Sequence, residues 1–334
     1  MQRIPQLDSL RALAILAVFL NHALHLKMLW MGVDLFFILS GFLITGVLLN
    51  AKHRPLGGYL AYFYARRARR LTAPYAMLLT LVSLVVGLAW TRHWYLYIVL
   101  TNLLEPLHIP HPAAFSPLWS LAVEEQFYLL WPFAVYFLNE RRLCRLCVVL
   151  IVAAAVLRGA LHFSDYLPIY TLTPFRMDML ATGALVCLAW RSHRDAIERW
   201  GGGAGVVLGV IGMTGIGLLV HLGISTGANT RIGNVLIFES SLSICLGIML
   251  YALGGRGVGW LRTRPLMYIG KISYSMYLAH AGIILLVETR LHGMLAAVVA
   301  LGLTIAYAAL SWRAVETPLL RGKSPRAELQ MERA

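Results

Sequence analysis

Ten apolar stretches, separated by short polar segments, restrict what this chain can fold into more than any other feature of its sequence. A helix of about twenty apolar residues is long enough to cross the hydrocarbon core of a bilayer. The predicted spans are 7–26, 32–50, 71–90, 118–138, 146–162, 171–190, 203–222, 233–253, 266–287 and 293–312. We therefore predict an all-α fold, a polytopic helical bundle embedded in a membrane.

The composition agrees with a membrane protein and indicates that the chain holds no soluble domain. The 334 residues are 59% hydrophobic and 13% charged, whereas soluble domains carry roughly 25% charged residues. We predict one membrane domain over residues 1–320 and a short basic cytoplasmic tail over residues 321–334. The first span lacks a fitting cleavage site, so we expect it to remain as an anchor and not to be removed as a signal peptide.

The distribution of Lys and Arg predicts the orientation of the bundle. With the N-terminus in the cytoplasm, 22 of the 29 Lys and Arg residues fall in inner segments and 4 in outer loops, as the positive-inside rule requires. This rule explains the net charge of +14 without a nucleic-acid partner. Both termini are then cytoplasmic, and the short apolar stretch 94–104 is expected to be an interfacial or re-entrant piece on the outer side.

Eleven ionisable side chains lie within the predicted spans and are candidate functional residues. A charged side chain costs roughly 2.5–3.5 kcal/mol at mid-bilayer on insertion scales, so such residues mark functional sites by default. They are Arg11, His22, Asp34, Glu124, Glu125, Arg158, Arg176, Asp178, Glu239, Lys271 and His280. A simple anchor or scaffold would not need so many.

Two of these residues share one face of the first span. Arg11 and His22 are eleven positions apart, which in an α-helix corresponds to about three turns and an axial distance of about 16 Å. Asp8 precedes Arg11 by one helical turn and can pair with it. Taken singly, Arg11 could be a snorkelling end residue and His22 a hydrogen-bonded interior histidine. Taken together, they predict a polar stripe that lines a cavity.

A run of four arginines precedes the third predicted span on the inner side. The run consists of Arg66, Arg67, Arg69 and Arg70. Guanidinium groups match the geometry of phosphate oxygens, so the run predicts an anion site. Contact with lipid headgroups is the alternative.

The fourth span carries the adjacent carboxylates Glu124 and Glu125 near its outer end. Neighbouring side chains on a helix point about 100° apart, so at most one of the two faces a given pocket. A carboxylate near an imidazole can orient the ring and raise its basicity. One of these glutamates is therefore a candidate partner of His22.

Other motifs have a packing explanation. Gly41, next to Ser40, permits close approach of two backbones, and Gly205 and Gly209 have the small-residue spacing of membrane helix contacts. Cys144 and Cys147 have no second cysteine pair and no matching histidines, so we predict no metal site there.

Seven segments, in order along residues 7–320, resemble the acyltransferase 3 family of integral membrane O-acyltransferases. They are "LDSLRALAILAVFLNH", "GVDLFFILSGFLIT", "RRARRLTAPY", "PLWSLAVEEQFYLLWP", "RMDMLATGAL", "GKISYSMYLAH" and "VETPL". The resemblance implies transfer of an acyl group from acyl-CoA, acetyl-CoA being the expected donor, to a hydroxyl of a cell-surface glycan or a small acceptor. It implies a location in the bacterial cytoplasmic (inner) membrane and no permanently bound cofactor.

The resemblance also assigns roles to individual residues. Arg11 and His22 match the family's Arg/Lys-x10-His motif, and Glu124 matches the glutamate of the "SLxxExQFY" segment. Arg67 and Arg70 match its Arg-x-x-Arg motif, although Arg66 and Arg69 have the same spacing. The remaining candidates that the family segments contain are Ser40, Gly41, Asp8, Asp34, Arg176, Asp178, Tyr274 and His280. Some members carry a fused esterase-like domain, which we do not expect here, so a separate extracytoplasmic partner protein is a further expectation.

These inferences combine into one hypothesis and two rivals. The arginines would bind the phosphates of coenzyme A on the inner face, and the thioester would reach His22. His22 would act as general base or carry the acyl group briefly. A transporter or flippase of a saccharide or lipid-linked intermediate is the main alternative, although no inverted repeats with broken helices are evident. A structural partner in a polysaccharide assembly complex is the third reading.

Overall fold

The computed structural model describes residues 4–161, 163, 165–224, 229–255 and 257–321, and within these ranges it contains helices and no strands. Ten helices are long: α1 (Pro5–Leu24), α2 (Met31–Ala51), α3 (Leu56–Val86), α5 (Leu118–Phe137), α6 (Glu140–Ala160), α8 (Met177–Ser192), α9 (Arg194–His221), α10 (Arg231–Leu253), α11 (Arg264–Glu288) and α12 (Gly293–Ser311). Short helices α4 (Leu96–Val99), α7 (Leu167–Thr171) and α13 (Thr317–Arg321) lie between or after them. The all-α prediction is confirmed.

Each long helix overlaps one predicted span, and eight helical segments of the described chain are long and apolar enough to cross a membrane. The two long helices outside that set are α5, whose first half carries two glutamates and a glutamine, and α8, which has only 16 residues. The stretch 94–104 contains only the short helix α4 and 3₁₀ turns, so it is not an eleventh long helix. The predicted tail lies outside the described residues from 322 onward.

The main difference from the predicted spans is the start of α3, which begins at Leu56 and not at 71. Pro55 precedes the helix, and the arginines between are good helix formers. The helix ends where Gly87 adopts a φ of 79°, which a residue with a side chain rarely takes. The arginine run therefore lies within a 31-residue helix and not at its entrance.

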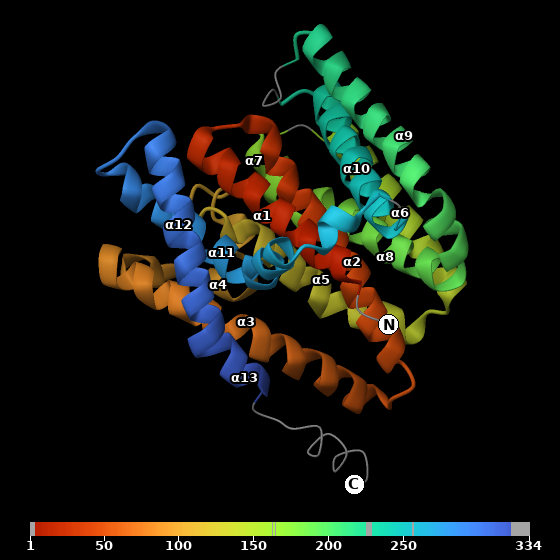
Figure 1. Cartoon of the computed structure of the whole chain (residues 1–334), viewed down its shortest axis with the longest axis horizontal. Helices are drawn as coiled ribbons and strands as arrows, with labels where there is room; N and C mark the ends of the chain where they lie inside the picture. The colour runs from red at the N-terminus through yellow and green to blue at the C-terminus, as the bar shows by residue number, and fades with distance from the viewer. Residues whose placement is uncertain (1–3, 162, 164, 225–228, 256, 322–334) are drawn as a thin grey trace.

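Helices α2 and α8 form the centre of the bundle, and two glycines bring their backbones together. A methyl group on Gly41 would lie 2.0 Å from the Leu180 carbonyl oxygen, and one on Gly183 would lie 2.0 Å from the Ile38 carbonyl oxygen. Small residues permit this approach in membranes, where dispersion contacts drive helix association. Figure 1 shows α2 and α8 between the α9–α10 pair and α3.

Helices α1 and α11 lie side by side and run in the same direction. Near their starts, Gly270 packs against the Asp8 carbonyl, and the Ser9 hydroxyl donates to the Leu261 carbonyl at 2.5 Å. Near their ends, His22 contacts His280. The two helices are therefore in contact along most of the length of α1.

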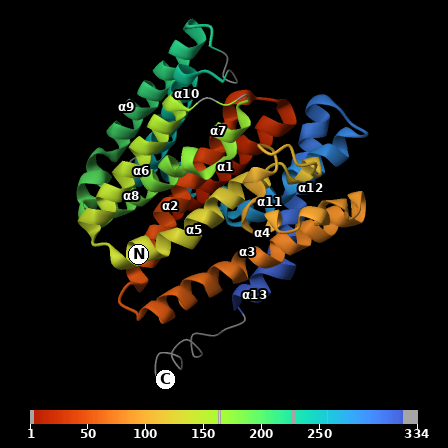
Figure 2. The same ribbon diagram turned by 180° about the vertical axis from the view of Figure 1, so that it is seen from behind.

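Helices α9 and α10 pack as a pair at the side of the molecule opposite α3, as Figures 1 and 2 both show. Gly205, one of the two glycines predicted to pack, lies against the Gly247 carbonyl, whereas a methyl group on Gly209 would meet no atom within 4 Å. The contact continues along the pair at Gly201 and Gly212. The packing prediction holds for Gly205, and the backbone nitrogen of Gly209 also lies close to Gly247, although a methyl group on Gly209 would point away from α10.

Candidate functional site

The imidazole of His22 lies near the end of α1, at the end of the bundle that the sequence predicts to face outward. Its Nδ1 is 2.9 Å from the Val18 carbonyl oxygen and 3.2 Å from Nε2 of His280 in α11. The two rings are tilted by 53° with their centroids 5.0 Å apart. His280 is fully buried, whereas His22 is exposed. Of the two rings, His22 is therefore the one that lies at the protein surface.

Hydrogen bonds within α11, and from α11 to the start of α5, hold the buried histidine in place. His280 Nδ1 lies 2.6 Å from the Tyr277 carbonyl oxygen. The Tyr277 hydroxyl donates to the Pro117 carbonyl at 3.0 Å and lies 2.6 Å from the Ser120 hydroxyl, so α11 is tied to the start of α5. The rings of Tyr277 and His280 are in contact, with centroids 5.4 Å apart. This end of the site is built from α1, α5 and α11.

Three guanidinium groups lie within electrostatic range of one another about three helical turns deeper. Arg11 of α1 lies in electrostatic contact with Arg67 of α3 and Glu124 of α5. Arg70, one turn beyond Arg67, faces Arg11 and Arg67. Among the described residues, none of these three arginines forms an ion pair with a carboxylate within 4.0 Å. We call Arg11, Arg67 and Arg70 the arginine cluster.

Helix geometry separates the four arginines of α3. The guanidinium of Arg67 stacks on the Tyr128 ring at 3.7 Å, and its buried Nε has no hydrogen-bond partner. Arg66 is exposed and contacts Tyr62, and Arg69 donates to the Ala65 carbonyl of its own helix. Of the two Arg-x-x-Arg frames that the sequence left open, the frame of Arg67 and Arg70 faces the interior.

One hypothesis from the sequence placed the Glu124 carboxylate beside His22. The structure does not show this contact. The Glu124 carboxylate accepts a hydrogen bond from the Tyr128 hydroxyl at 2.7 Å, and that hydroxyl also bonds Ser40. Because Glu124 points to its own helix neighbour and the arginine cluster, His280 occupies the place beside His22 that a carboxylate was expected to fill. Through its hydrogen bond to Tyr128, Ser40 lies beside the arginine cluster. Gly41 faces the α8 backbone, where no ligand fits.

Glu316 belongs to this region, although only the quoted "VETPL" segment pointed to it. It ends a π-helical turn, Trp312–Glu316, which follows α12. Such turns are rare and are often found at functional sites. The buried carboxylate accepts a hydrogen bond from the Ser275 hydroxyl at 2.7 Å and lies in electrostatic contact with Arg70. It partly balances the charge of the cluster.

The other buried charges form a separate network among α2, α6, α8 and α10. Arg176 pairs with Asp34, which also accepts a hydrogen bond from Ser241 at 2.6 Å. Arg158 pairs with Asp178 at 2.7 Å and with Glu239 at 2.5 Å. The side chains of four of these residues are fully buried: Asp34, Arg158, Arg176 and Asp178. The paired charges hold four helices together, so this network has a structural explanation.

Four more candidates lie near the site or at its edge. The Tyr274 hydroxyl donates to the Leu71 carbonyl at 3.2 Å, which connects α11 to α3. Glu125 is close to Glu124 and lies in electrostatic contact with Tyr274. Lys271 is exposed, and its ammonium group lies 4.6 Å from the centre of the Trp312 ring. Asp8, the predicted partner of Arg11, is in electrostatic contact with it.

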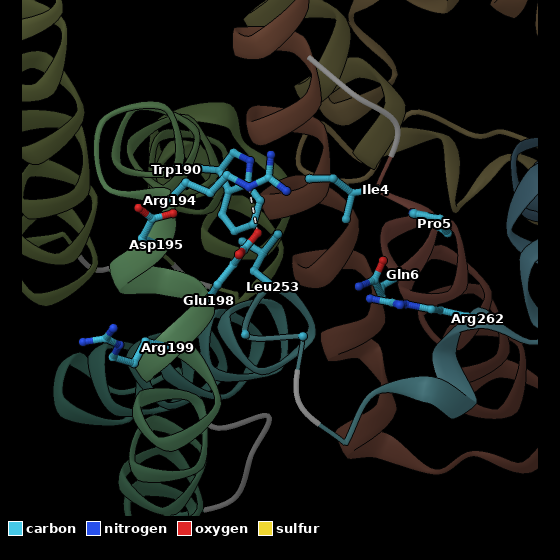
Figure 3. A pocket seen from close by; sticks show the side chains of 12 residues that line it. Ile4, Pro5, Gln6, Trp190, Arg194, Asp195, Glu198, Arg199, Leu253 and Arg262 are labelled. Atoms are coloured by element: carbon cyan, nitrogen blue, oxygen red, sulfur yellow. Dashed lines mark hydrogen bonds and ion pairs between the residues drawn. The ribbon is translucent and has the colours of Figure 1, made fainter.

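A cavity of about 540 Å³ opens at the end of the bundle that the sequence predicts to face the cytoplasm, between the starts of α1 and α9 and the end of α10. Figure 3 shows Arg262 beside Gln6 on one wall, and Arg194 paired with Glu198 on the other. The sequence did not predict this cavity. None of its lining residues belongs to the arginine cluster or to the histidine pair.

The fold and the site together define a multi-pass membrane protein with an imidazole at one end of a helix and an arginine cluster about 16 Å along it. The family model described as "Acyltransferase domain" matches residues 4–313, nearly the whole chain. The chain therefore belongs to the acyltransferase 3 family, which its motifs resemble.

Curated relatives are similar over most of this chain. The peptidoglycan O-acetyltransferase OatA of Listeria monocytogenes is 29% identical over 95% of the chain and 56% of its own length. The O-acetyltransferase OatA of Staphylococcus aureus is 28% identical over 95% and 57%, and the putative peptidoglycan O-acetyltransferase YrhL of Bacillus subtilis is 29% identical over 85% and 49%. The chain spans about half the length of these relatives. No solved structure matches it.

Proposed function

We propose that this protein is a membrane O-acyltransferase that moves an acyl group, acetyl in the first instance, from acyl-CoA to a hydroxyl of a cell-wall glycan. It would work in the cytoplasmic membrane of a bacterium. The relatives named as O-acetyltransferases support the reaction, and two of them are named for peptidoglycan. The observation that carries the proposal is the arrangement of α1, with Arg11 in the arginine cluster and His22 exposed at the opposite end.

The arginine cluster fits the donor. Three guanidinium groups lie near one another with the carboxylates Glu124, Asp8 and Glu316 around them, and among the described residues none of the three arginines forms an ion pair within 4.0 Å. Guanidinium groups without a close ion pair favour binding of an anion, and their planar forks match phosphate oxygens. The diphosphate of coenzyme A would bind here. Its pantetheine arm would extend along α1 and carry the thioester over about 16 Å to His22.

His22 would act as the general base. Nε2 of the imidazole takes the proton of the acceptor hydroxyl as the oxygen attacks the thioester carbonyl. The new C–O bond forms, the C–S bond breaks, and the departing thiolate takes the proton back from His22, so the ring ends as it began. Base catalysis by a positioned histidine contributes typically 10²–10⁴-fold. The products are the ester and coenzyme A.

The test is thiol release by the purified protein in lipid nanodiscs, with acetyl-CoA and a soluble peptidoglycan fragment as acceptor. His22→Ala should lower kcat by about 10²–10⁴-fold, the usual contribution of such a base. His25→Asn is the matched control, because His25 is exposed at the end of the same helix with a φ of 53°, which Asn tolerates. Full activity of His22→Ala would remove the mechanism, and absence of any donor-dependent thiol release would remove the acyl-CoA donor.

No observation supports the alternative function, that of a transporter or flippase. Membership of an acyltransferase family favours group transfer.

A further inference from the structure

We propose that His280 is a positioning residue for His22, one that accepts a hydrogen bond from His22 Nδ1 and thereby keeps His22 Nε2 free of a proton. This inference rests on the proposed function, because it assigns a partner to the base of that reaction. Sequence patterns suggested a carboxylate for this role, whereas the structure places a second imidazole there.

The tautomer of His280 follows from its partner. Its Nδ1 lies 2.6 Å from the Tyr277 carbonyl oxygen, and a carbonyl oxygen can only accept a hydrogen bond. Nδ1 of His280 therefore carries the proton. In a neutral imidazole the other nitrogen is then an acceptor. Nε2 of His280 thus presents a lone pair, and it presents it to His22 at 3.2 Å.

The tautomer of His22 follows in the same way. Its Nδ1 lies 2.9 Å from the Val18 carbonyl oxygen, so this nitrogen also carries its proton. The N–H is shared between that oxygen and Nε2 of His280, which makes a three-centre hydrogen bond. Both acceptors favour the same tautomer, and Nε2 of His22 is left as the basic nitrogen. No hydrogen bond to this atom is found within the described ranges.

The surroundings of His280 suit a positioning role. Its side chain is 0% exposed, and the Tyr277 hydroxyl that packs beside it is bonded to Pro117 and Ser120 of the neighbouring helix. The lone pair of His280 is therefore fixed in space, while His22 is exposed to the acceptor. Catalytic bases are commonly oriented by a third group in this way. A neutral partner also leaves the resting His22 neutral, as a general base must be.

Two variants separate positioning from packing. His280→Leu removes the acceptor and keeps an apolar side chain of similar reach. His280→Gln keeps an acceptor, since its amide oxygen can accept the His22 N–H. We expect His280→Leu to lower kcat by about 10–100-fold, by analogy with the loss when a group that orients a metal-bound histidine is removed, with the KM for acetyl-CoA unchanged. His280→Gln should recover most of that loss.

A spectroscopic measurement reads the tautomer without turnover. In protein labelled with ¹⁵N-histidine and reconstituted in lipid vesicles, His22 signals are assigned by their loss in His22→Ala. We expect a protonated Nδ1 and an unprotonated Nε2 in the wild type, a mixture of tautomers in His280→Leu, and the wild-type pattern in His280→Gln.

The outcomes distinguish this inference from the proposed function. Wild-type kcat in His280→Leu, together with loss of activity in His22→Ala, overturns the role of His280 and leaves the base in place. A protonated Nε2 in wild-type His22 overturns it as well, and this result needs no variant to fold. Full activity of His22→Ala would overturn the proposed function itself.

Discussion

At the scale of single residues, the position of an arginine on its helix determines whether its side chain faces the interior of the bundle. Arg66, Arg67, Arg69 and Arg70 follow one another closely, yet only Arg67 and Arg70 face the interior. The sequence could predict an anion site from the run but could not select the frame, because both pairs have the same spacing. The selection depends on which face of α3 packs against α5 and α11.

This difference gives a prediction with an internal control. Replacing Arg67 and Arg70 together with Ala should weaken acetyl-CoA binding at least tenfold, because two charge-assisted contacts to phosphate are lost. The affinity of the wild type should also fall more steeply with salt than that of the variant. Isothermal titration in nanodiscs measures both effects.

The control is the double variant of Arg66 and Arg69, which removes the same charge from the same helix on its other face. Its affinity for acetyl-CoA should stay within about twofold of the wild type. Equal losses in the two double variants would mean that the donor responds only to overall charge.

At the scale of helices, the apolar pattern of the sequence predicted where the long elements lie, and packing set their exact ends. The span length follows from bilayer thickness, so each long helix overlaps a predicted stretch. The predicted span did not include the first part of α3, because the spans were assigned from runs of apolar residues alone. Arginines are good helix formers, so the helix extends through them. The partner of His22 was missed too, since His280 is 258 positions away and only tertiary packing joins them.

The contact between α2 and α8 gives a prediction about stability. In Gly41→Ala the added methyl group meets the Leu180 carbonyl at 2.0 Å, and because that atom is backbone the helices must separate. We expect a loss of about 1–3 kcal/mol, the usual cost of overpacking. Thermal unfolding in detergent measures it.

Gly202→Ala of α9 serves as comparison, because no atom lies within 4 Å of the added group. Its thermal midpoint should equal that of the wild type or exceed it slightly, since Ala favours helix over Gly. A Gly41→Ala protein as stable as Gly202→Ala would show that the two central helices can move apart at little cost.

At the scale of the whole molecule, the charge distribution predicts which end faces the cytoplasm. The loop between α2 and α3 should lie inside, and the 3₁₀ turn Ala89–His93 that follows α3 should lie outside. The donor and acceptor ends of the proposed reaction depend on this orientation.

Cysteine labelling in intact cells tests the orientation. The background carries Cys144→Ser, and the two test positions, Arg92 and His53, are both exposed. A membrane-impermeant maleimide should modify Arg92→Cys in intact cells. It should modify His53→Cys only after the membrane is permeabilised. The reverse pattern would place His22 on the cytoplasmic side, and the proposed route of the acyl group would fail.

The parallel contact of α1 and α11 has a consequence for regulation. Backbone atoms fix the two helices at Asp8 and Gly270, and two imidazoles meet at the far end with 3.2 Å between their nitrogens. A slip of one residue displaces a helix by about 1.5 Å, enough to part the rings. A change in membrane thickness or tension that slides α1 along α11 would therefore lower the rate of acyl transfer.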